Sequence, residues 1–262
     1  MNLTTHTFLE GSSIGVTVLN PVPNDLLALQ GEVREAFGWS LNADDLSAHE
    51  MEQHFSEPLP FGQESWSIEA RTMFLKQLQR AICSTERLVV VGAASEPIQT
   101  SQYPGAMFVA ADGAVGAIDD LSRVLCVVSD GDGAEHLERA AKFGVHIVLH
   151  AHGDNADIWK QLVSAWALFE AQPPLTLTHQ STAMYEGLVN PGGFTDGDRA
   201  LCFIQALGRS LDDVECIGFR TDVVGPWSGN TDPERKKQKL AWMEESMRRL
   251  GVEHHLIKEL RG

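Results

Sequence analysis

Short apolar runs that end in glycine or polar residues recur along the chain from residue 86 onward. Their length and their content of valine, isoleucine and leucine are typical of strands that are buried on both faces of a sheet. The strands that this pattern predicts are Leu88–Val91, Met107–Ala110, Val124–Val128, Val145–Leu149, Leu175–Thr178 and Val214–Ile217.

Between several of these runs, apolar residues recur every three or four positions, which is the spacing of one face of an α-helix. This spacing predicts helices at Ala134–Phe143, Ile158–Phe169 and Arg199–Leu207. A C-terminal helix begins at Arg235, and the residues of its apolar face are Leu240, Met243, Met247 and Leu250. Since strands and helices alternate, the predicted fold class is α/β, a mainly parallel, Rossmann-like sheet with helices on both faces.

The first 85 residues follow a different pattern, helical or mixed, and several prolines interrupt it. A helix is predicted over Ser65–Cys83, with Ser65 or Ser67 as its N-terminal cap. Its apolar residues have helical spacing and are expected to face the core: Ile68, Met73, Phe74, Leu75, Leu78 and Ile82. We therefore expect a smaller N-terminal region, residues 1–85, followed by an α/β domain, residues 86–262, that carries the catalytic residues.

The chain has 262 residues and is strongly acidic, with 36 Asp and Glu against 20 Lys and Arg and a formal net charge of −16. Such a charge argues against nucleic acid or an anionic membrane as a partner, because both favour a basic surface. The four cysteines form no Cys-x-x-Cys pair, and no apolar run approaches the roughly 18 residues of a membrane span. The N-terminus lacks the basic and apolar segments of a secretory signal, so we expect a cytoplasmic protein with reduced thiols.

Aspartates follow three of the predicted strands, at the ends where parallel sheets bind ligands. Asp130 and Asp132 lie in a Ser-Asp-Gly-Asp-Gly run after Val124–Val128, and Asp112 and Asp154 follow two other strands. Taken alone, the Asp-Gly-Asp-Gly run is compatible with a solvated turn or with a bound cation. Clustered carboxylates repel one another unless they share a proton or hold a cation, so acids from several strands favour a metal ion. Oxygen ligands suit Mg²⁺.

The segment His-Ala-His-Gly-Asp-Asn, which follows another strand, gathers His150, His152, Asp154 and Asn155. A His-x-His pair at a strand end is able to ligate a transition metal. Neutral histidines also donate hydrogen bonds to a phosphate or a substrate ring, or hold a loop together. The residues themselves leave these alternatives open.

A glycine-rich loop opens one of the predicted helices. Thr195 or Asp196 is suited to cap that helix, which is a structural role. Free amides at a helix N-terminus also bind anions, and Arg199 adds a permanent positive charge there. Near the C-terminus, Lys236 and Lys239 are either solvated or able to reach a phosphate.

These motifs occur in a fixed order along the chain: Ala111–Ala114, Ser129–Gly133, His150–Asn155, Gly193–Arg199 and the late Lys236/Lys239 element. Together they resemble the archaeal-type 6-hydroxymethyl-7,8-dihydropterin diphosphokinase family, over about residues 86–242. The Asp-Leu-Asp-Gly that is usual in the family is Asp-Gly-Asp-Gly here, which keeps both carboxylates. Its usual turns near Gly92–Glu96 and Gly218–Asp222 are altered in this chain.

The resemblance implies that diphosphate passes from ATP to the hydroxymethyl group of 6-hydroxymethyl-7,8-dihydropterin, with Mg²⁺ as cofactor and AMP as second product, in folate or tetrahydromethanopterin biosynthesis. It also implies a fold similar to that of thiamine pyrophosphokinase. By this likeness Asp130, Asp132 and Asp154 are the Mg²⁺ ligands and, with Arg199, the catalytic residues. The residues expected to contact ATP or the pterin are Asp112, Gly113, His150, His152, Asn155, Thr195, Asp196, Asp198, Lys236 and Lys239.

Two functions of other classes are compatible with the same residues. A metal-dependent hydrolase would use His150 and His152 with Zn²⁺ or Mn²⁺ to activate water. A glycosyltransferase-like, nucleotide-binding protein would depend instead on the basic C-terminal segment and the altered turns. ATP and a pterin are the expected partners, and assembly into a homo-oligomer is left open.

Overall fold

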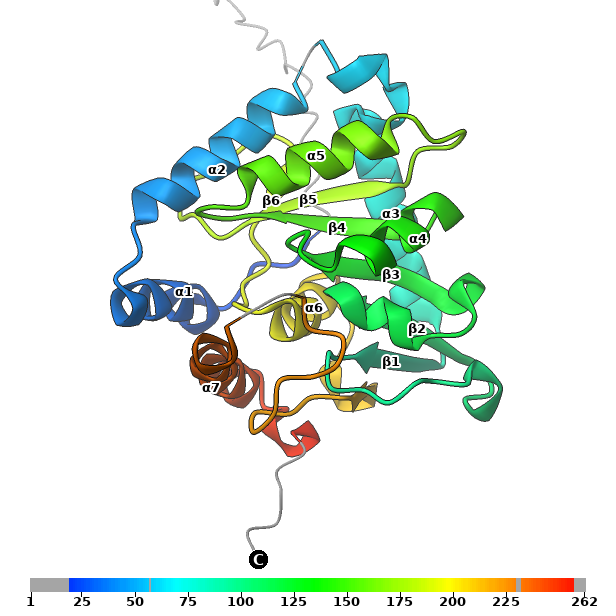
Figure 1. Cartoon of the computed structure of the whole chain (residues 1–262), viewed down its shortest axis with the longest axis vertical. Helices are drawn as coiled ribbons and strands as arrows, with labels where there is room; N and C mark the ends of the chain where they lie inside the picture. Colours follow the sequence, from blue (N-terminus) through cyan, green and yellow to red (C-terminus); the bar gives the residue numbers. More distant parts are fainter. Residues whose placement is uncertain (1–18, 57, 230–231, 257–262) are drawn as a thin grey trace, which may run out of the picture.

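A computed structural model of the chain describes residues 19–56, 58–229 and 232–256. Its centre is a seven-stranded sheet in the order β6-β5-β4-β3-β2-β1-β7, in which all neighbouring strands are parallel (Figure 1). The predicted α/β class with a parallel sheet is confirmed. The strands are β1 (Arg87–Val91), β2 (Ala106–Ala111), β3 (Val124–Ser129), β4 (His146–Ala151), β5 (Leu175–His179), β6 (Leu188–Val189) and β7 (Val214–Ile217).

Every strand predicted from an apolar run is present, with ends that differ from the prediction by at most two residues. Strand β6 was not predicted, because two residues are too few to show a periodic pattern. All residues of β4 and β5 are buried, as expected for parallel strands that are covered on both faces.

Helices cover both faces of this sheet (Figure 1). Helices α2, α4 and α5 contribute to the core on one face, and α3, α6 and α7 contribute to the core on the other. Helix α1 lies beside α7, where Glu32 pairs with Arg249. The helices are α1 (Asn24–Phe37), α2 (Leu41–His54), α3 (Ile68–Ser84), α4 (Ala134–Phe143), α5 (Ala156–Trp166), α6 (Asp196–Ala206) and α7 (Pro233–Arg249).

The two larger apolar clusters among the described residues hold the layers together. On one face, Met51 of α2, Leu137 of α4 and Trp159 of α5 are fully buried against the strands. On the other face, Ile82 of α3 and Phe203 of α6 are fully buried. Each such side chain contributes about 1.5–3 kcal/mol relative to an exposed one. Since α2 and α3 belong to the N-terminal region, this region packs directly on the sheet that carries the candidate chemistry.

Helix α3 has most of the apolar stripe that its sequence predicts. The hydroxyl oxygen of Ser67 accepts a hydrogen bond from the backbone N–H of Ala70 (3.1 Å) and caps the helix. Leu75 and Leu78 are buried, but Met73 is 48% exposed. The prediction that Met73 faces the core is wrong. An α-helix turns by about 100° per residue, so the side chain of Met73, two residues before Leu75, points to a different side of the helix.

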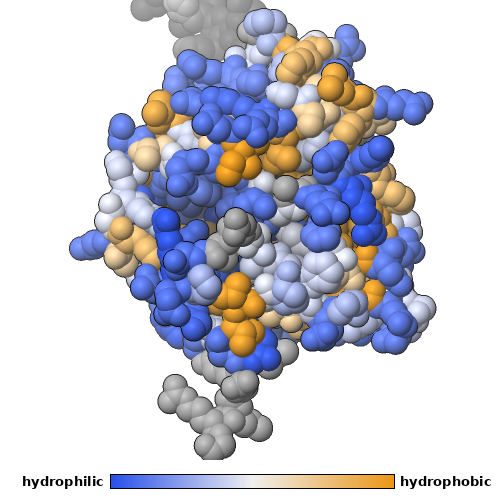
Figure 2. Space-filling view, in the orientation of Figure 1, coloured by the Kyte–Doolittle hydropathy of each residue, from blue (hydrophilic) through white to orange (hydrophobic). Residues whose placement is uncertain are grey.

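The face of the molecule shown in Figure 2 is mostly hydrophilic, and its apolar residues form small, separate groups. This distribution agrees with the large number of charged residues in the sequence. Among the residues that the structure describes, none of the helices combines the length and the apolar character that crossing a membrane requires.

Two buried histidines on neighbouring strands are held in their neutral form. Nε2 of His146 lies 2.8 Å from Oγ1 of Thr176, and Nδ1 of His179 accepts a hydrogen bond from the N–H of Ser181 (3.2 Å). Burial lowers the pKa of His146 to about 3 and that of His179 to about 4. Both values lie below the pKa of about 6.5 expected in the unfolded chain.

The free energy of unfolding should therefore fall as the pH falls from about 6.5 toward 4, because in that range only the unfolded chain takes up protons at these residues. Each histidine contributes a slope of about 1.4 kcal/mol per pH unit. Urea denaturation between about pH 7 and 5 measures this slope. The variant His146→Gln should lower this slope by the contribution of one histidine, about 1.4 kcal/mol per pH unit. An unchanged slope would contradict the conclusion that His146 is neutral in the folded protein.

Candidate active site

Three aspartates from two neighbouring loops come together at the carboxyl ends of β2 and β3. Asp112 follows β2, and Asp130 and Asp132 follow β3. Each offers a carboxylate oxygen, and these oxygens all lie within 4.8 Å of one another. Strands β2 and β3 are paired in parallel, so their loops emerge at the same edge of the sheet. This cluster of Asp112, Asp130 and Asp132 is named the acidic centre.

Glycines allow the two loops to approach this closely. A Cβ atom at Gly133 would overlap Oδ2 of Asp112, so only glycine fits there. Gly131, between the two aspartates of the β3 loop, has a φ angle of 99°, which glycine adopts without strain. The hydroxyl of Ser129 donates to Oδ1 of Asp112 and accepts from the N–H of Gly131 (2.9 Å). These bonds tie the β2 and β3 loops to each other.

Burial and repulsion both disfavour further negative charge at this site. Burial, together with the charges of Asp196, Asp130 and Asp132, raises the pKa of Asp112 well above its usual range. Burial and the charge of Asp130 raise the pKa of Asp196, at the start of α6, to about 7. A bound cation would relieve both effects.

Asp130 is the carboxylate that stays ionised. Burial alone would raise its pKa, but a hydrogen bond from His152 and the positive charges of His152, Arg199 and Lys239 hold that pKa below its usual range. Nε2 of His152 lies 3.2 Å from Oδ2 of Asp130. The surroundings therefore hold Asp130 ionised, while the raised pKa values of Asp112 and Asp196 favour their protonated forms.

The ligand atoms of the acidic centre are carboxylate oxygens alone. Mg²⁺ prefers oxygen ligands, and proteins commonly hold it through one or two carboxylates together with substrate phosphates and water. Zinc and other softer ions favour nitrogen and sulfur, which this cluster does not supply. The residues present therefore fit Mg²⁺.

Asp154 does not belong to the acidic centre. Its side chain is 90% exposed, and its Oδ1 lies 3.6 Å from Nδ1 of His152. The amide of Asn155 donates to the backbone carbonyl of Asp130 (2.8 Å) and its oxygen accepts from the N–H of His152 (3.0 Å), which sets the turn of this loop and leaves Asp154 in solvent. The structure thus groups Asp112, and not Asp154, with Asp130 and Asp132.

The two histidines of the His-Ala-His-Gly-Asp-Asn segment have different surroundings. His150 is fully buried, and its Nδ1 lies 2.9 Å from Oγ1 of Thr178. Burial and the charge of Arg199 lower the pKa of His150 well below its usual range, so it is neutral. His152 is partly exposed and faces Asp130. Among the described residues, the group that could hold a metal ion contains neither histidine.

The loop before α6 is held by its own side chains. Asp198 is fully buried and accepts from the N–H groups of Phe194 (2.7 Å) and Thr195 (2.8 Å), so it fixes the loop and does not face the cavity. Thr195 is the N-cap residue of α6. Arg199 is buried, with Nη1 2.8 Å from Oδ1 of Asp196 and Nη2 donating to the carbonyl of Phe194 (2.6 Å).

A cavity adjoins the acidic centre. Asp112, Asp132, Thr195, Asp196 and Lys236 of α7 line one part of it. Its other walls include Gly92, Ala94, Gly218, Phe219 and Trp227. Gly92 follows β1 and Gly218 follows β7, the point at which the strand order reverses, and ligands of open α/β sheets bind at such points.

Gly113 and Lys239 were expected to contact ATP or the pterin, and the structure shows packing contacts for both. A Cβ atom at Gly113 would lie 2.5 Å from the carbonyl oxygen of Trp227, so this glycine permits close backbone packing. Nζ of Lys239 lies 5.7 Å from the ring centre of Trp39 and 6.0 Å from that of Phe194. Lys239 is not among the residues that line the cavity, in contrast to Lys236.

Helix α2 reaches this site through a contact that no pattern in the sequence indicates. Asp44 of α2 is buried, and its Oδ1 accepts a hydrogen bond from the N–H of Gly153 (2.9 Å), next to His152. Asp44 and Gly153 are 109 residues apart in the chain. No local spacing signals such a contact.

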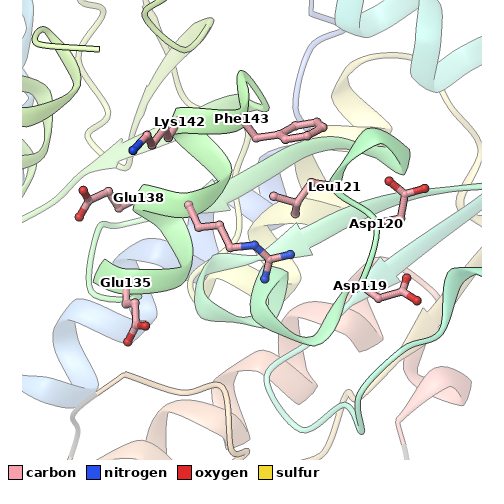
Figure 3. A pocket seen from close by; sticks show the side chains of 8 residues that line it. Asp119, Asp120, Leu121, Glu135, Glu138, Lys142 and Phe143 are labelled. Carbon is pink, nitrogen blue, oxygen red and sulfur yellow. The ribbon is translucent and has the colours of Figure 1, made fainter. Parts of the chain in front are cut away.

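A second hollow lies between α4 and the turn that contains Asp119 and Asp120 (Figure 3). Oδ1 of Asp119 accepts from the N–H of Thr100 (3.0 Å), and Oδ1 of Asp120 accepts from the N–H of Ser122 (3.0 Å). These acids stabilise turns. The hollow shares no residue with the acidic centre or its cavity, and we assign it no chemistry.

The chain is similar to the 6-hydroxymethyl-7,8-dihydropterin pyrophosphokinase of Pyrococcus furiosus, with 31% identity over 183 residues that cover 68% of this chain and 73% of the relative. The chain belongs to the 6-hydroxymethyl-7,8-dihydropterin pyrophosphokinase family. No family model matches it. Membership in this pyrophosphokinase family confirms the enzyme class that the motifs predicted. It also gives the acidic centre a chemical context, because enzymes that transfer phosphate groups use divalent cations to bridge phosphate oxygens.

Proposed function

We propose that this chain transfers the diphosphate group of ATP to the hydroxymethyl oxygen of 6-hydroxymethyl-7,8-dihydropterin and releases AMP. The observation that carries the proposal is the convergence of Asp112, Asp130 and Asp132 beside a cavity, in a member of the pyrophosphokinase family. The P. furiosus relative is named for the pterin substrate, which supports the same acceptor here.

The reaction is a single displacement at phosphorus. The hydroxymethyl oxygen attacks the β-phosphorus of ATP, and a new O–P bond forms. The bond from the β-phosphorus to the oxygen that bridges it to the α-phosphate breaks, and AMP leaves with that oxygen. The hydroxyl proton is lost to solvent or to a nearby base. Catalysis of such a transfer depends on positioning and on neutralising phosphate charge.

In this proposal the carboxylates of the acidic centre hold Mg²⁺. When bound, the ion offsets the negative charge of the polyphosphate and polarises the phosphorus–oxygen bonds. Lys236 lies in the same cavity wall, and in this proposal its ammonium group pairs with a phosphate oxygen. Of the backbone amides at the start of α6, those of Asp196 and Gly197, which follow the N-cap Thr195, would offer further donors to an anion.

Other residues act on the site through their neighbours. Arg199 is buried and paired with Asp196, so its charge steadies the carboxylates and does not contact a substrate. Asn155 and Asp198, which were expected to bind substrate, hold the two motif loops in shape. His152 keeps Asp130 ionised and oriented.

The two alternatives from other classes gain no support. A hydrolase would need His150 and His152 on one ion, but their rings face Thr178 and Asp130. A glycosyltransferase-like role is not favoured by any feature of the described residues, and family membership points to pyrophosphate transfer.

Incubation of the protein with MgATP and 6-hydroxymethyl-7,8-dihydropterin should yield AMP and the pterin diphosphate in equal amounts, as measured by chromatography and mass spectrometry. The variant Asp132→Asn should lose at least about a hundredfold in turnover, because it weakens charge neutralisation at the reacting phosphates. Its thermal unfolding should stay close to that of the wild type, since Asp132 is exposed.

The matched control is Asp213→Asn, an exposed aspartate in the segment that precedes β7, which should keep full activity. Release of ADP instead of AMP, or near-normal turnover in Asp132→Asn, would contradict the proposed function.

Lys236 and Lys237 offer a second comparison. The variant Lys236→Met should raise the KM for ATP about tenfold, which corresponds to about 1.4 kcal/mol of lost binding. Lys237 is exposed and pairs with Glu234 (3.2 Å), so Lys237→Met should leave the KM unchanged. Steady-state kinetics with varied ATP distinguishes the two, and equal effects would show that Lys236 has no specific role.

A further inference from the structure

Helix α1 carries two buried polar side chains one turn apart. Gln30 and Arg34 are only 4% and 8% exposed, although the helix belongs to the region for which the sequence suggests no function. Residues four apart lie on the same face of a helix. The apolar residues Leu29 and Val33 are buried beside them. Burial of two polar groups in this position requires specific partners.

Gln30 is bonded to the loop that opens α6. Its amide donates to the carbonyl oxygen of Gly193 (3.1 Å) and to Oδ1 of Asn190 (3.0 Å). Nδ2 of Asn190 donates in return to Oε1 of Gln30 (2.9 Å). Gly193 lies two residues before the N-cap Thr195 and three before Asp196, so this contact fixes the loop next to the acidic centre.

Arg34 reaches the other motif loop through Asp44. Its Nη1 donates to Oδ2 of Asp44 (3.0 Å) and to the carbonyl of Gln180 (3.2 Å). Oδ1 of Asp44 accepts from the N–H of Gly153 (2.9 Å), and Gln180 donates to both carboxylate oxygens. Gly153 follows His152, whose ring is bonded to Asp130 of the acidic centre. A continuous chain of contacts therefore leads from α1 to the candidate metal ligand.

Stability alone does not account for this arrangement. Both members of the Arg34–Asp44 pair are buried, and the cost of removing two charges from water commonly cancels the gain from their attraction. What the pair does supply is a fixed, charged acceptor for a backbone N–H in an otherwise exposed turn. Bonds of this kind are shorter and more directional than neutral ones.

We propose that Gln30, Arg34 and Asp44 are positioning residues, through which the N-terminal helices hold both active-site loops in the geometry that the acidic centre needs. Asp44 sets the turn that keeps His152 on Asp130, and Gln30 sets the start of α6. The statement about turnover rests on the proposed function. The statement about cation binding rests on one part of it alone, the binding of a divalent cation at the acidic centre, and does not depend on the substrates.

Two double variants test the Asp44 contact without leaving an unpaired buried charge. Both replace Arg34 with Met. In Arg34→Met/Asp44→Asn the new amide keeps an acceptor for the N–H of Gly153, whereas in Arg34→Met/Asp44→Leu the acceptor is lost. Mn²⁺, used as a probe, should bind the Leu variant about tenfold more weakly than the Asn variant in calorimetry, the size of effect that second-layer contacts have on metal sites. In activity assays, the kcat of the Leu variant should be lower than that of the Asn variant, with little difference in KM.

Leu78→Ala in α3 is the control for destabilisation, because Leu78 is buried in the core and takes no part in the two loops. It should lower the thermal unfolding temperature without changing Mn²⁺ affinity. Equal Mn²⁺ binding by the Asn and Leu variants, or a loss that tracks stability as in Leu78→Ala, would overturn the proposal.

The single variant Gln30→Met provides an independent test should the double variants fail to fold. It should also weaken Mn²⁺ binding and lower kcat, and unchanged values would overturn the role of Gln30. If the wild type forms no AMP, the proposed function fails, but the Mn²⁺ comparison still decides the positioning roles.

Discussion

The acidic centre confines three carboxylates to a partly buried site, with an oxygen of each within 4.8 Å of the others. At this distance two like charges repel by several kcal/mol when water is partly excluded. The fold imposes this cost, because the carboxyl ends of the paired strands β2 and β3 lie side by side at the sheet edge. The site is therefore stable only when protons, cationic side chains or a metal ion offset the charge.

The surroundings of the acidic centre reflect this requirement. Arg199 supplies nearby positive charge, His152 lies within hydrogen-bond distance of Asp130, and burial raises the pKa of Asp112 and of Asp196. The protein as a whole carries a net charge of −16, so an anionic nucleotide gains no attraction from its average surface. Binding of a polyphosphate therefore depends on local positive charge, and Lys236 in the cavity wall is one such group.

Much of the fold follows from local patterns. The apolar runs predicted all strands except the two-residue β6, and helical spacing predicted α4 with both ends correct. The strand ends also located Asp130 and Asp132. The choice between Asp112 and Asp154 was not accessible in this way, because both simply follow strands. In the structure, Asp112 has a left-handed backbone (φ 47°) and lies with Asp130 and Asp132, whereas the contacts of Asn155 leave Asp154 in solvent.

Other features depend on distant parts of the chain. Asn155 and Asp198 are polar residues in motif loops, and the sequence does not distinguish one that faces a substrate from one that faces the backbone. Gln30 and Asp44 meet their partners across 163 and 109 residues. Only the packing of α1 and α2 against the sheet brings them to the site, so their contribution becomes visible in three dimensions alone.

The central claim is that Asp112, Asp130 and Asp132 together bind one divalent cation. Calorimetric titration of Mn²⁺ into the wild type, Asp112→Asn and Asp154→Asn tests it most directly, since the resemblance implies Asp154 as a ligand whereas the structure groups Asp112 with Asp130 and Asp132. The structure predicts a single site whose affinity falls at least about tenfold in Asp112→Asn and is unchanged in Asp154→Asn. Loss of binding in Asp154→Asn, with normal binding in Asp112→Asn, would contradict it.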